Sequence, residues 1–284
     1  MPALEFTFPG PNGPTINRMG FGAMRVCGPR VWGMPADPEG ARALLRRVVE
    51  LGVNFIDTAD AYGPGTSEQL IAEALHPYPK GMIIATKGGI LRPPDKSWQS
   101  DARPEYLQTA CEASLKRLKI ECIDLYQLHA PDDSVRFEDS IKALARLREQ
   151  GKVRMVGLSN VSVAQLEVAE AIVPIVSVQN RFNLGDQSHA EVLAACDRKG
   201  IAFLPWYPLG SGVLTKPGTA AAQIADELGV APGQVALAWL LHLSPVVVPI
   251  PGTSQIAHLE QNLGATKIEL SAAHMARLGN SQLG

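Results

Sequence analysis

Four polar side chains stand at, or just beyond, the ends of three successive apolar segments. Asp57 ends the first segment and Tyr62 follows it in the stretch NFIDTADAYG, while Lys87 and His129 end the next two. A phenol is a poor acid at neutral pH, because its reference pKa is about 10. A neighbouring cation favours the phenolate, a carboxylate holds that cation, and an imidazole can hydrogen-bond a substrate oxygen. Together these groups suit the protonation of an oxygen that gains negative charge, as in carbonyl reduction.

Each of these residues alone has an ordinary structural explanation. An aspartate at a strand end often caps a helix or a turn, a lysine is often a solvated charge, and a histidine is often a satisfied structural group. The catalytic interpretation therefore depends on a fold that brings all four to one place.

The apolar segments are too continuous in hydrophobicity for half-exposed antiparallel strands, and they favour parallel strands covered on both faces. Eight such segments occur, at 19–22, 53–57, 82–87, 122–129, 153–159, 175–179, 201–206 and 246–250. Between them lie segments with a helical period. In residues 37–52, Asp37 can cap a helix, Pro38 occupies its first position and Gly52 stops it. Helices are also predicted over 104–118, 137–151 and 162–172.

Eight strands that alternate with helices predict an α/β fold, a (β/α)₈ TIM barrel, in one domain over residues 1–284. The opening stretch LEFTF…PNGPTIN predicts a β-hairpin that closes the barrel floor. An open doubly wound sheet is the alternative, but it needs a glycine-rich phosphate turn after an early strand, and no G-x-G-x-x-G occurs. Active sites of such barrels lie at the carboxyl ends of the strands, so the four polar residues would converge on one mouth.

Composition limits the class of protein. The chain has 284 residues, 46% hydrophobic and 19% charged, with a formal charge of −2, so it can bury a large core. That charge gives no electrostatic reason to expect a nucleic acid or an anionic membrane as a partner. The first residues lack the regions of a secretory signal, and no apolar stretch approaches the roughly 18 residues of a membrane helix, so we expect a cytoplasmic protein.

Core packing, rather than metal binding or disulfides, is expected for Cys27, Cys111, Cys122 and Cys196.

These motifs resemble those of the aldo-keto reductase superfamily. The Asp, Tyr, Lys, His tetrad of that family falls on Asp57, Tyr62, Lys87 and His129, within NFIDTADAYG, IATKGG and YQLHAPD. The resemblance runs from GFGAM in the first strand to IPGTSQIAHLEQNLG after the last. It implies a barrel that binds a nicotinamide dinucleotide without a Rossmann fold, needs no metal, and reduces a small carbonyl compound by hydride transfer. The stretches FGAMRVCGP, WGMPAD and PLGSG are most similar to a bacterial branch that includes pyridoxal reductases.

The resemblance also implies cofactor-binding positions. Ser159, Asn160 and Gln179 would hold the nicotinamide carboxamide. Trp206 would stack on the ring, a role that suits a flat aromatic side chain flanked by amides, with core packing as the alternative. The other implied positions along the cofactor are Gly22, Ala23, Met24, Asp57, Tyr207, Pro208, Leu209, Gly210, Ser211 and Pro251. The adenosine-phosphate motif falls on Gly252, Thr253, His258, Gln261 and Asn262.

The sequence departs from the family at this last motif. Many members carry Lys at the position of Gly252 and Arg at that of His258, and those cations meet the 2′-phosphate of NADP. The backbone N–H groups of Gly252 and Thr253 could still form an anion site at a helix start, and the hydroxyls of Thr253 and Ser254 can add hydrogen bonds. We therefore expect NADPH as the cofactor, with only weak discrimination against NADH, so that NADH use is open.

The sequence ends with LSAAHMARLGNSQLG, soon after the last expected helix, so the long C-terminal loop of steroid-reducing members is not expected. Trp32 in WGMPAD and Trp98 in SWQS are then the expected substrate walls, with exposed surface patches as the alternative. An open mouth and two aromatic side chains would accept the flat ring of pyridoxal or of other aromatic aldehydes. The sequence leaves the physiological carbonyl compound open.

Two other functions fit parts of this pattern. Lys87 could form a Schiff base, as barrel aldolases do, but an ion pair with Asp57 would keep the amine charged and poorly nucleophilic. A redox-sensing regulatory subunit that binds NADP, resembling the barrel subunits of potassium channels, would also keep the tetrad. Turnover of NADPH with simple aldehydes distinguishes a reductase from both. We expect a monomer whose partner is a small carbonyl substrate.

Overall fold

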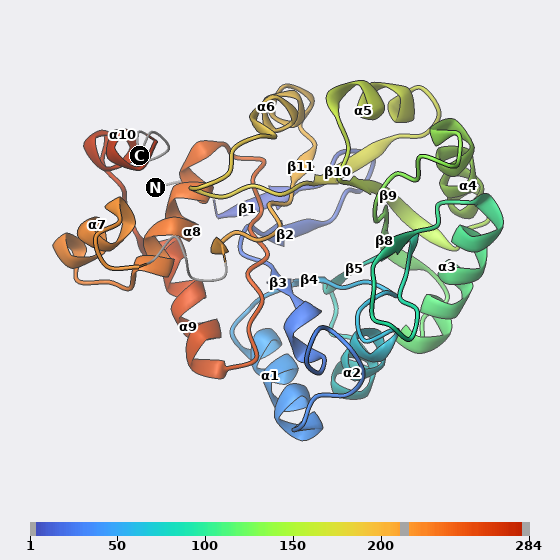
Figure 1. Cartoon of the computed structure of the whole chain (residues 1–284), viewed down its shortest axis with the longest axis horizontal. Helices are drawn as coiled ribbons and strands as arrows, with labels where there is room; N and C mark the ends of the chain where they lie inside the picture. The colour runs from blue at the N-terminus through green and yellow to red at the C-terminus, as the bar shows by residue number, and fades with distance from the viewer. Residues whose placement is uncertain (1–3, 211–215, 280–284) are drawn as a thin grey trace.

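A curled sheet of parallel strands forms the centre of the molecule (Figure 1). The computed structural model describes residues 4–210 and 216–279. Across the sheet the order is β11 (Ala202–Phe203), β10 (Ile175–Gln179), β9 (Val153–Ser159), β8 (Ile123–Leu128), β5 (Ile83–Gly88), β4 (Phe55–Asp57) and β3 (Phe21–Gly22). Every neighbouring pair is parallel. These seven strands coincide with seven of the eight predicted segments, and nearly all of their residues are buried, as expected of strands covered on both faces.

Residues 246–251 lie where the eighth strand was predicted, but they do not form a regular strand. Phe203 donates its N–H to Val246 O and its own oxygen accepts from Val248 N, both at 2.9 Å. On the other side, Gly20 N donates to Pro249 O at 2.9 Å. The segment therefore has backbone bonds to β11 and to the residues beside β3. Its prolines carry no N–H, and this interrupts a regular ladder.

Helices surround the sheet, and α3, α4 and α5 follow its outer face in Figure 1. The α-helices are α1 (Pro38–Glu50), α2 (Thr66–Leu75), α3 (Pro104–Leu118), α4 (Phe137–Glu149), α5 (Val163–Glu170), α6 (Ala190–Lys199), α7 (Ala220–Leu228), α8 (Pro232–Leu243), α9 (Ile256–Gly264) and α10 (Ala272–Gly279). Two 3₁₀ turns are η1 (Ala23–Val26) and η3 (Ala265–Lys267). Asp37 Oδ1 accepts the N–H of Gly40 at 2.8 Å, and Pro38 is the first residue of α1, as predicted. None of the helices in the described ranges is long and apolar enough to cross a bilayer.

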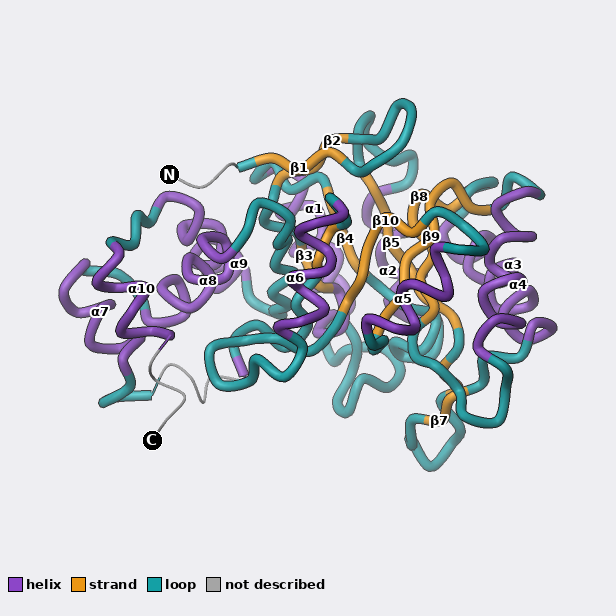
Figure 2. The backbone as a smooth tube through the Cα atoms, turned by 90° about the horizontal axis from the view of Figure 1, so that it is seen from above, coloured by secondary structure: helices purple, strands orange, loops and turns teal. Residues whose placement is uncertain are grey.

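Two antiparallel hairpins lie at opposite ends of the sheet (Figure 2). The predicted N-terminal hairpin is present as β1 (Glu5–Thr7) and β2 (Thr15–Asn17), and its side chains Phe6 and Ile16 are buried in the main core. The second hairpin pairs β6 (Ile90–Leu91) with β7 (Gln99–Ser100). It follows β5, so it stands beside the carboxyl ends of the strands.

The prediction of core packing is right for three of the four cysteines. Cys27, Cys111 and Cys196 are buried thiols, whereas Cys122 is exposed. Burial raises the pKa of Cys111 to about 12, so that thiol is inert at neutral pH. The prediction for Cys122 is wrong because β8 begins one residue later, at Ile123, and Cys122 lies in the preceding bend.

Candidate active site

The fold brings the four polar residues to one end of the parallel strands. Asp57 is the last residue of β4 and Lys87 is the penultimate residue of β5, while His129 directly follows β8. Tyr62 lies in the loop between β4 and α2. All four are buried, with 2%, 8%, 0% and 7% of Asp57, Tyr62, Lys87 and His129 exposed.

An ion pair stands at the centre of this group. Lys87 Nζ donates to Asp57 Oδ2 at 2.7 Å, to the backbone oxygen of Thr58 at 2.9 Å and to the hydroxyl of Tyr62 at 3.4 Å. An ammonium group has three donors, so all of them are used. The lysine therefore joins the carboxylate to the phenol.

The loop after β4 holds Tyr62 in position because it stays attached to β5. Thr58 N donates to Ala85 O at 2.8 Å and Asp60 N donates to Lys87 O at 3.2 Å. The chain then turns, with Tyr62 N bonded to Ala59 O at 3.1 Å. A tyrosine placed on so constrained a loop loses little further freedom when a substrate binds.

Burial and charge act in opposite directions on the protonation of these groups. Burial raises the pKa of Tyr62 above its usual value, and the positive charge of Lys87 only partly offsets this. Burial alone would lower the pKa of Lys87, but the charge of Asp57 and the hydrogen bonds to Asp57 and Tyr62 act against burial, and the pKa is raised. Burial, and secondly the charge of Lys87, lowers the pKa of His129 well below its usual value. At neutral pH the site therefore contains a protonated phenol, an ammonium and a neutral imidazole.

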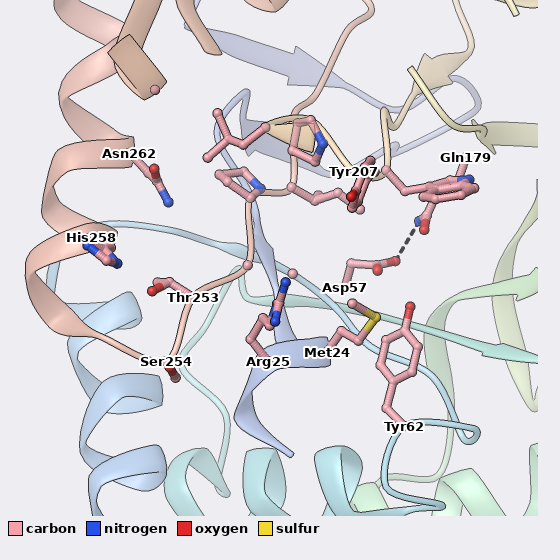
Figure 3. Close-up of a pocket in the computed structure, with 18 of the residues that line it drawn as sticks. Met24, Arg25, Asp57, Tyr62, Gln179, Tyr207, Thr253, Ser254, His258 and Asn262 are labelled. Carbon is pink, nitrogen blue, oxygen red and sulfur yellow. Dashed lines mark hydrogen bonds between the residues drawn. The ribbon is translucent and has the colours of Figure 1, made fainter. Parts of the chain in front are cut away.

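Two glutamines, one on β8 and one on β10, support the carboxylate. Gln179 Nε2 donates to Asp57 Oδ1 at 2.8 Å (dashed line in Figure 3), and Gln127 Nε2 donates to the same oxygen at 3.1 Å. Gln127 was missed by the sequence reasoning, although its position two residues before His129 places it on the same face of β8. Gln179, predicted to hold a carboxamide, is here a second support of Asp57.

Asp57, Tyr62 and His129 open onto a cavity of about 970 Å³, and Lys87 lies buried behind them. Most of the predicted cofactor and substrate positions line it: Gly22, Met24, Asp57, Trp98, Ser159, Asn160, Gln179, Trp206, Tyr207, Pro208, Leu209, Pro251, Gly252, Thr253, His258, Gln261 and Asn262. Tyr62 and His129 line it as well. Its volume lies at the upper end of the range for ligand pockets, roughly 300–1,000 Å³.

Some predicted residues do not line the cavity. Ala23 is fully buried beside it, Gly210 is also buried, and Trp32 packs outside it with its ring 5.7 Å from the guanidinium carbon of Arg92. Ser211 lies outside the described residues. The expected second aromatic substrate wall at Trp32 is thus not part of the cavity surface.

Aromatic and amide side chains meet near the middle of the cavity. Trp206 Nε1 donates to Asn160 Oδ1 at 2.9 Å, and Asn160 Nδ2 donates to His129 O at 3.0 Å. Asn160 has φ 59°, and Tyr207, which directly follows Trp206, has φ 62°. Both angles lie in the left-handed region that few non-glycine residues adopt. The indole is therefore locked in position by an amide whose own backbone is constrained.

The opposite arm of the cavity is suited to an anion. Thr253, Ser254 and His258 lie at the start of α9, and Figure 3 shows the guanidinium of Arg25 pointing into the cavity close to Thr253. Arg25 was not predicted as a site residue, and its only sequence signal is its place just after the first strand. Residues 231–234, at the N-terminus of α8, also line the cavity, and they too were not predicted as site residues.

Three aromatic rings enclose the catalytic end. The ring centroids of Tyr62 and His129 are 5.9 Å apart, and Trp98 stands edge-on to both at 6.4 Å. His129 Nδ1 is buried and has no hydrogen-bond partner among the described residues. A carbonyl compound between these rings would have the phenol and the neutral imidazole near its oxygen.

The model of the Aldo/keto reductase family matches residues 18–281. This chain belongs to the aldo/keto reductase family. An uncharacterized oxidoreductase of Schizosaccharomyces pombe is 49% identical over 93% of this chain and 86% of its own length. Pyridoxine 4-dehydrogenase of Escherichia coli is 40% identical over 93% of this chain and 94% of its own length. A crystal structure of a thermostable aldo-keto reductase with the inhibitor epalrestat has a TM-score of 0.86 at 30% identity, and covers 98% of this chain and 99% of that one.

This aldo/keto reductase is accordingly an NAD(P)H-dependent oxidoreductase. The described residues fit a nicotinamide dinucleotide. One part of the cavity has the indole of Trp206 beside amide side chains, which suits the nicotinamide. The other part has hydroxyl groups and the guanidinium of Arg25, which suit the phosphates. Two glycines also keep its wall flat, since a Cβ on Gly252 would lie 2.6 Å from Gly22 O.

Proposed function

We propose that this protein reduces an aldehyde or a ketone to the alcohol with NADPH, and that Tyr62 is the general acid. The observation that carries the proposal is the position of Lys87 Nζ, which bonds both to Asp57 and to the hydroxyl of Tyr62 beside the cavity. A cation that contacts both a buried phenol and a buried carboxylate is suited to stabilise the phenolate left after proton transfer.

Each residue has a distinct part in this scheme. Tyr62 donates its proton to the carbonyl oxygen as negative charge develops there, and the charge of Lys87 stabilises the phenolate that remains. Asp57, held by its two glutamines, keeps the lysine charged. The neutral imidazole of His129 can donate an N–H to the same substrate oxygen. The bound nicotinamide supplies the hydride.

The preference for NADPH is a separate part of the proposal. Arg25, Thr253 and His258 line the arm of the cavity that would take the adenosine phosphate. One guanidinium in this arm favours the additional phosphate of NADPH, but neither cation that many family members use is present. We therefore propose a modest preference for NADPH and measurable turnover with NADH.

The protonation of Lys87 argues against a Schiff-base enzyme. Its pKa is raised despite burial by the charge of Asp57 and by its hydrogen bonds to Asp57 and Tyr62, so the neutral amine that would attack a carbonyl is scarce. Trapping with borohydride in the presence of a ketone should leave the protein unmodified.

The test is NADPH oxidation by the purified protein with a panel of aldehydes and ketones, followed by absorbance. Tyr62→Phe should lower kcat by about 10²- to 10⁴-fold, the range for proton transfer from a positioned side chain, while the Kd for NADPH stays within about threefold. NADPH binding without turnover of any carbonyl by the wild type would favour a regulatory subunit. Near wild-type turnover by the variant would remove Tyr62 from the mechanism.

Pyridoxal is a second, narrower candidate substrate. The relative from Escherichia coli named pyridoxine 4-dehydrogenase is 40% identical over nearly the whole chain, and Trp98 stands where a flat ring could stack. Comparison of kcat/KM for pyridoxal and for nitrobenzaldehyde decides between them. A pyridoxal value about tenfold lower, or about 1.4 kcal/mol of transition-state binding, would leave only the general activity.

We also propose that residues 246–251 act as the eighth member of a closed (β/α)₈ barrel. Their backbone bonds to Phe203 on one side and to Gly20 on the other support this arrangement. We propose in addition that residues 1–284 form a single domain that works as a monomer, since this chain alone supplies the phenol, the imidazole and the opposite wall of the cavity.

A further inference from the structure

Arg92 lies outside the cavity, yet its side chain joins two segments beside it. It follows β6, and only 7% of it is exposed. Its guanidinium donates to the backbone oxygens of Arg30 at 3.0 Å, Val31 at 3.3 Å and Lys96 at 3.3 Å. The tip of the β6–β7 hairpin is thereby attached to the loop that follows η1.

All three acceptor residues have a left-handed backbone. The φ angles are 60° at Arg30, 56° at Val31 and 66° at Lys96. Non-glycine residues rarely adopt this region, and a β-branched residue such as Val31 is an outlier there. Such conformations persist only where the surroundings hold them, and charge-assisted bonds from one planar guanidinium are suited to do so.

The same guanidinium covers one ring of the substrate end of the cavity. Its central carbon is 3.7 Å from the ring centroid of Trp98. Trp98 in turn stands edge-on to Tyr62 and to His129, at interplanar angles of 76° and 75°. With 46% of its surface exposed, the indole keeps contact area for a ligand.

We propose that Arg92 is a positioning residue which fixes Trp98 as the stacking surface for the substrate, so that planar aromatic aldehydes are the preferred substrate class. The inference rests on the proposed reductase function and deepens it. Without Arg92, the exposed indole of Trp98 would be mobile. It would lose conformational entropy when a ligand binds, and this loss weakens binding. Held by Arg92, it presents a preset plane on which an aromatic ring can stack, whereas a short aliphatic aldehyde gains little from it.

The experiment compares benzaldehyde with butanal in the wild type and in Arg92→Met, an apolar variant of similar length. We expect KM for benzaldehyde to rise about tenfold, equivalent to about 1.4 kcal/mol of binding. We expect KM for butanal, kcat for both aldehydes and Kd for NADPH to change less than about threefold, because Arg92 touches neither the reacting groups nor the cofactor arm. Equal loss on both aldehydes would overturn the inference.

A double-mutant cycle tests whether Arg92 acts through the indole. Trp98→Ala should raise KM for benzaldehyde, and addition of Arg92→Met to it should raise KM by less than about twofold more, because the two residues form one unit. Additive effects would contradict a positioning role. If Arg92→Met does not fold, Arg92→Lys keeps the charge without the planar fork and should show a smaller rise for benzaldehyde alone. An unchanged benzaldehyde KM in that variant would also overturn the inference.

If the proposed reductase function is wrong, the experiment gives a result that differs from those above. A wild type that reduces neither aldehyde refutes the reductase function itself. Benzaldehyde binding to the NADPH complex is then compared by calorimetry, and equal affinity of the wild type and Arg92→Met would refute the role of Arg92 independently of turnover.

Discussion

Tyr62 shows how burial and charge together set the acidity of one residue. From residue types alone, the neighbouring cation is expected to make the phenol a better acid. In the folded protein the pKa of Tyr62 is instead raised, because burial outweighs the charge of Lys87. The phenol is then fully protonated at neutral pH, which suits a proton donor, and the lysine limits the rise that burial alone would cause.

The arm of the cavity that contains Thr253 and His258 offers a test of cofactor choice at a single residue. His258→Arg adds a permanent cation to the exposed face of α9, where His258 lines the cavity. We expect the preference for NADPH over NADH to increase by about 1 to 3 kcal/mol, the scale of a hydrogen bond to a charged group. Calorimetric titration of both cofactors measures it.

Removal of the cation at Arg25 is the matched comparison for the addition of a cation at position 258. Arg25→Met removes the guanidinium that points into the same arm, so the preference for NADPH should decrease while NADH affinity is nearly constant. If neither substitution alters NADPH affinity, the 2′-phosphate lies elsewhere.

At the scale of the element, the loop between β4 and α2 carries a buried acid, Asp60, beside Tyr62. Burial raises the pKa of Asp60 to about 8, and the nearby charge of Glu68 adds to the effect. Tyr106 donates its hydroxyl to Asp60 Oδ2 at 3.4 Å, while Oδ1 has no partner among the described residues. The folded state therefore favours the protonated carboxyl.

The pKa of Asp60 predicts how the stability of this protein depends on pH. Between its ordinary value near 4 and about 8, the folded state keeps a proton that the unfolded state has lost, so the free energy of unfolding falls as pH rises. Asp60→Asn imitates the protonated form and should remove this part of the decline. Urea unfolding of both proteins at pH 5 and pH 8 measures it, and parallel declines would refute the assignment.

Elements with a long periodic signal could be predicted from the sequence, and shorter ones could not. The helix predicted over 104–118 is α3 with the same bounds, six strands lie within their predicted segments, and β5 extends one residue beyond its segment. The β6–β7 hairpin was missed because its strands have two residues each, too few to show a period of two. Trp98 could be named as an exposed aromatic, but its attachment through Arg92 depends on backbone conformations that no pattern in the sequence signals.

At the scale of the molecule, Arg18 joins the two halves of the chain. It is 1% exposed and donates to Leu241 O and Val247 O, each at 3.0 Å, so it fixes the end of α8 and the segment 246–251 to the residue that directly follows β2. Burial lowers its pKa to about 10, which leaves it charged at neutral pH. Nothing in the sequence marks this arginine, because its partners are backbone oxygens more than two hundred residues away.

Arg18→Met should reduce the free energy of unfolding by roughly 3 kcal/mol or more, since it leaves buried carbonyl oxygens without donors. Urea unfolding measures the loss. The control is Arg46→Met, which removes only an exposed ion pair with Glu39 and should change stability little. Equal stability of the two variants would show that the carbonyl groups find other donors.

The facing glycines at the cavity wall also constrain how this enzyme could evolve. A Cβ on Gly252 would lie 2.6 Å from Gly22 O, and a Cβ on Gly22 would lie 2.5 Å from Ile250 O. A lysine at position 252 would therefore require the backbone itself to move, whereas position 258 is open to the solvent. Under selection for a stricter choice of coenzyme, a substitution at position 258 in α9 needs no such backbone shift, whereas a substitution at either glycine does.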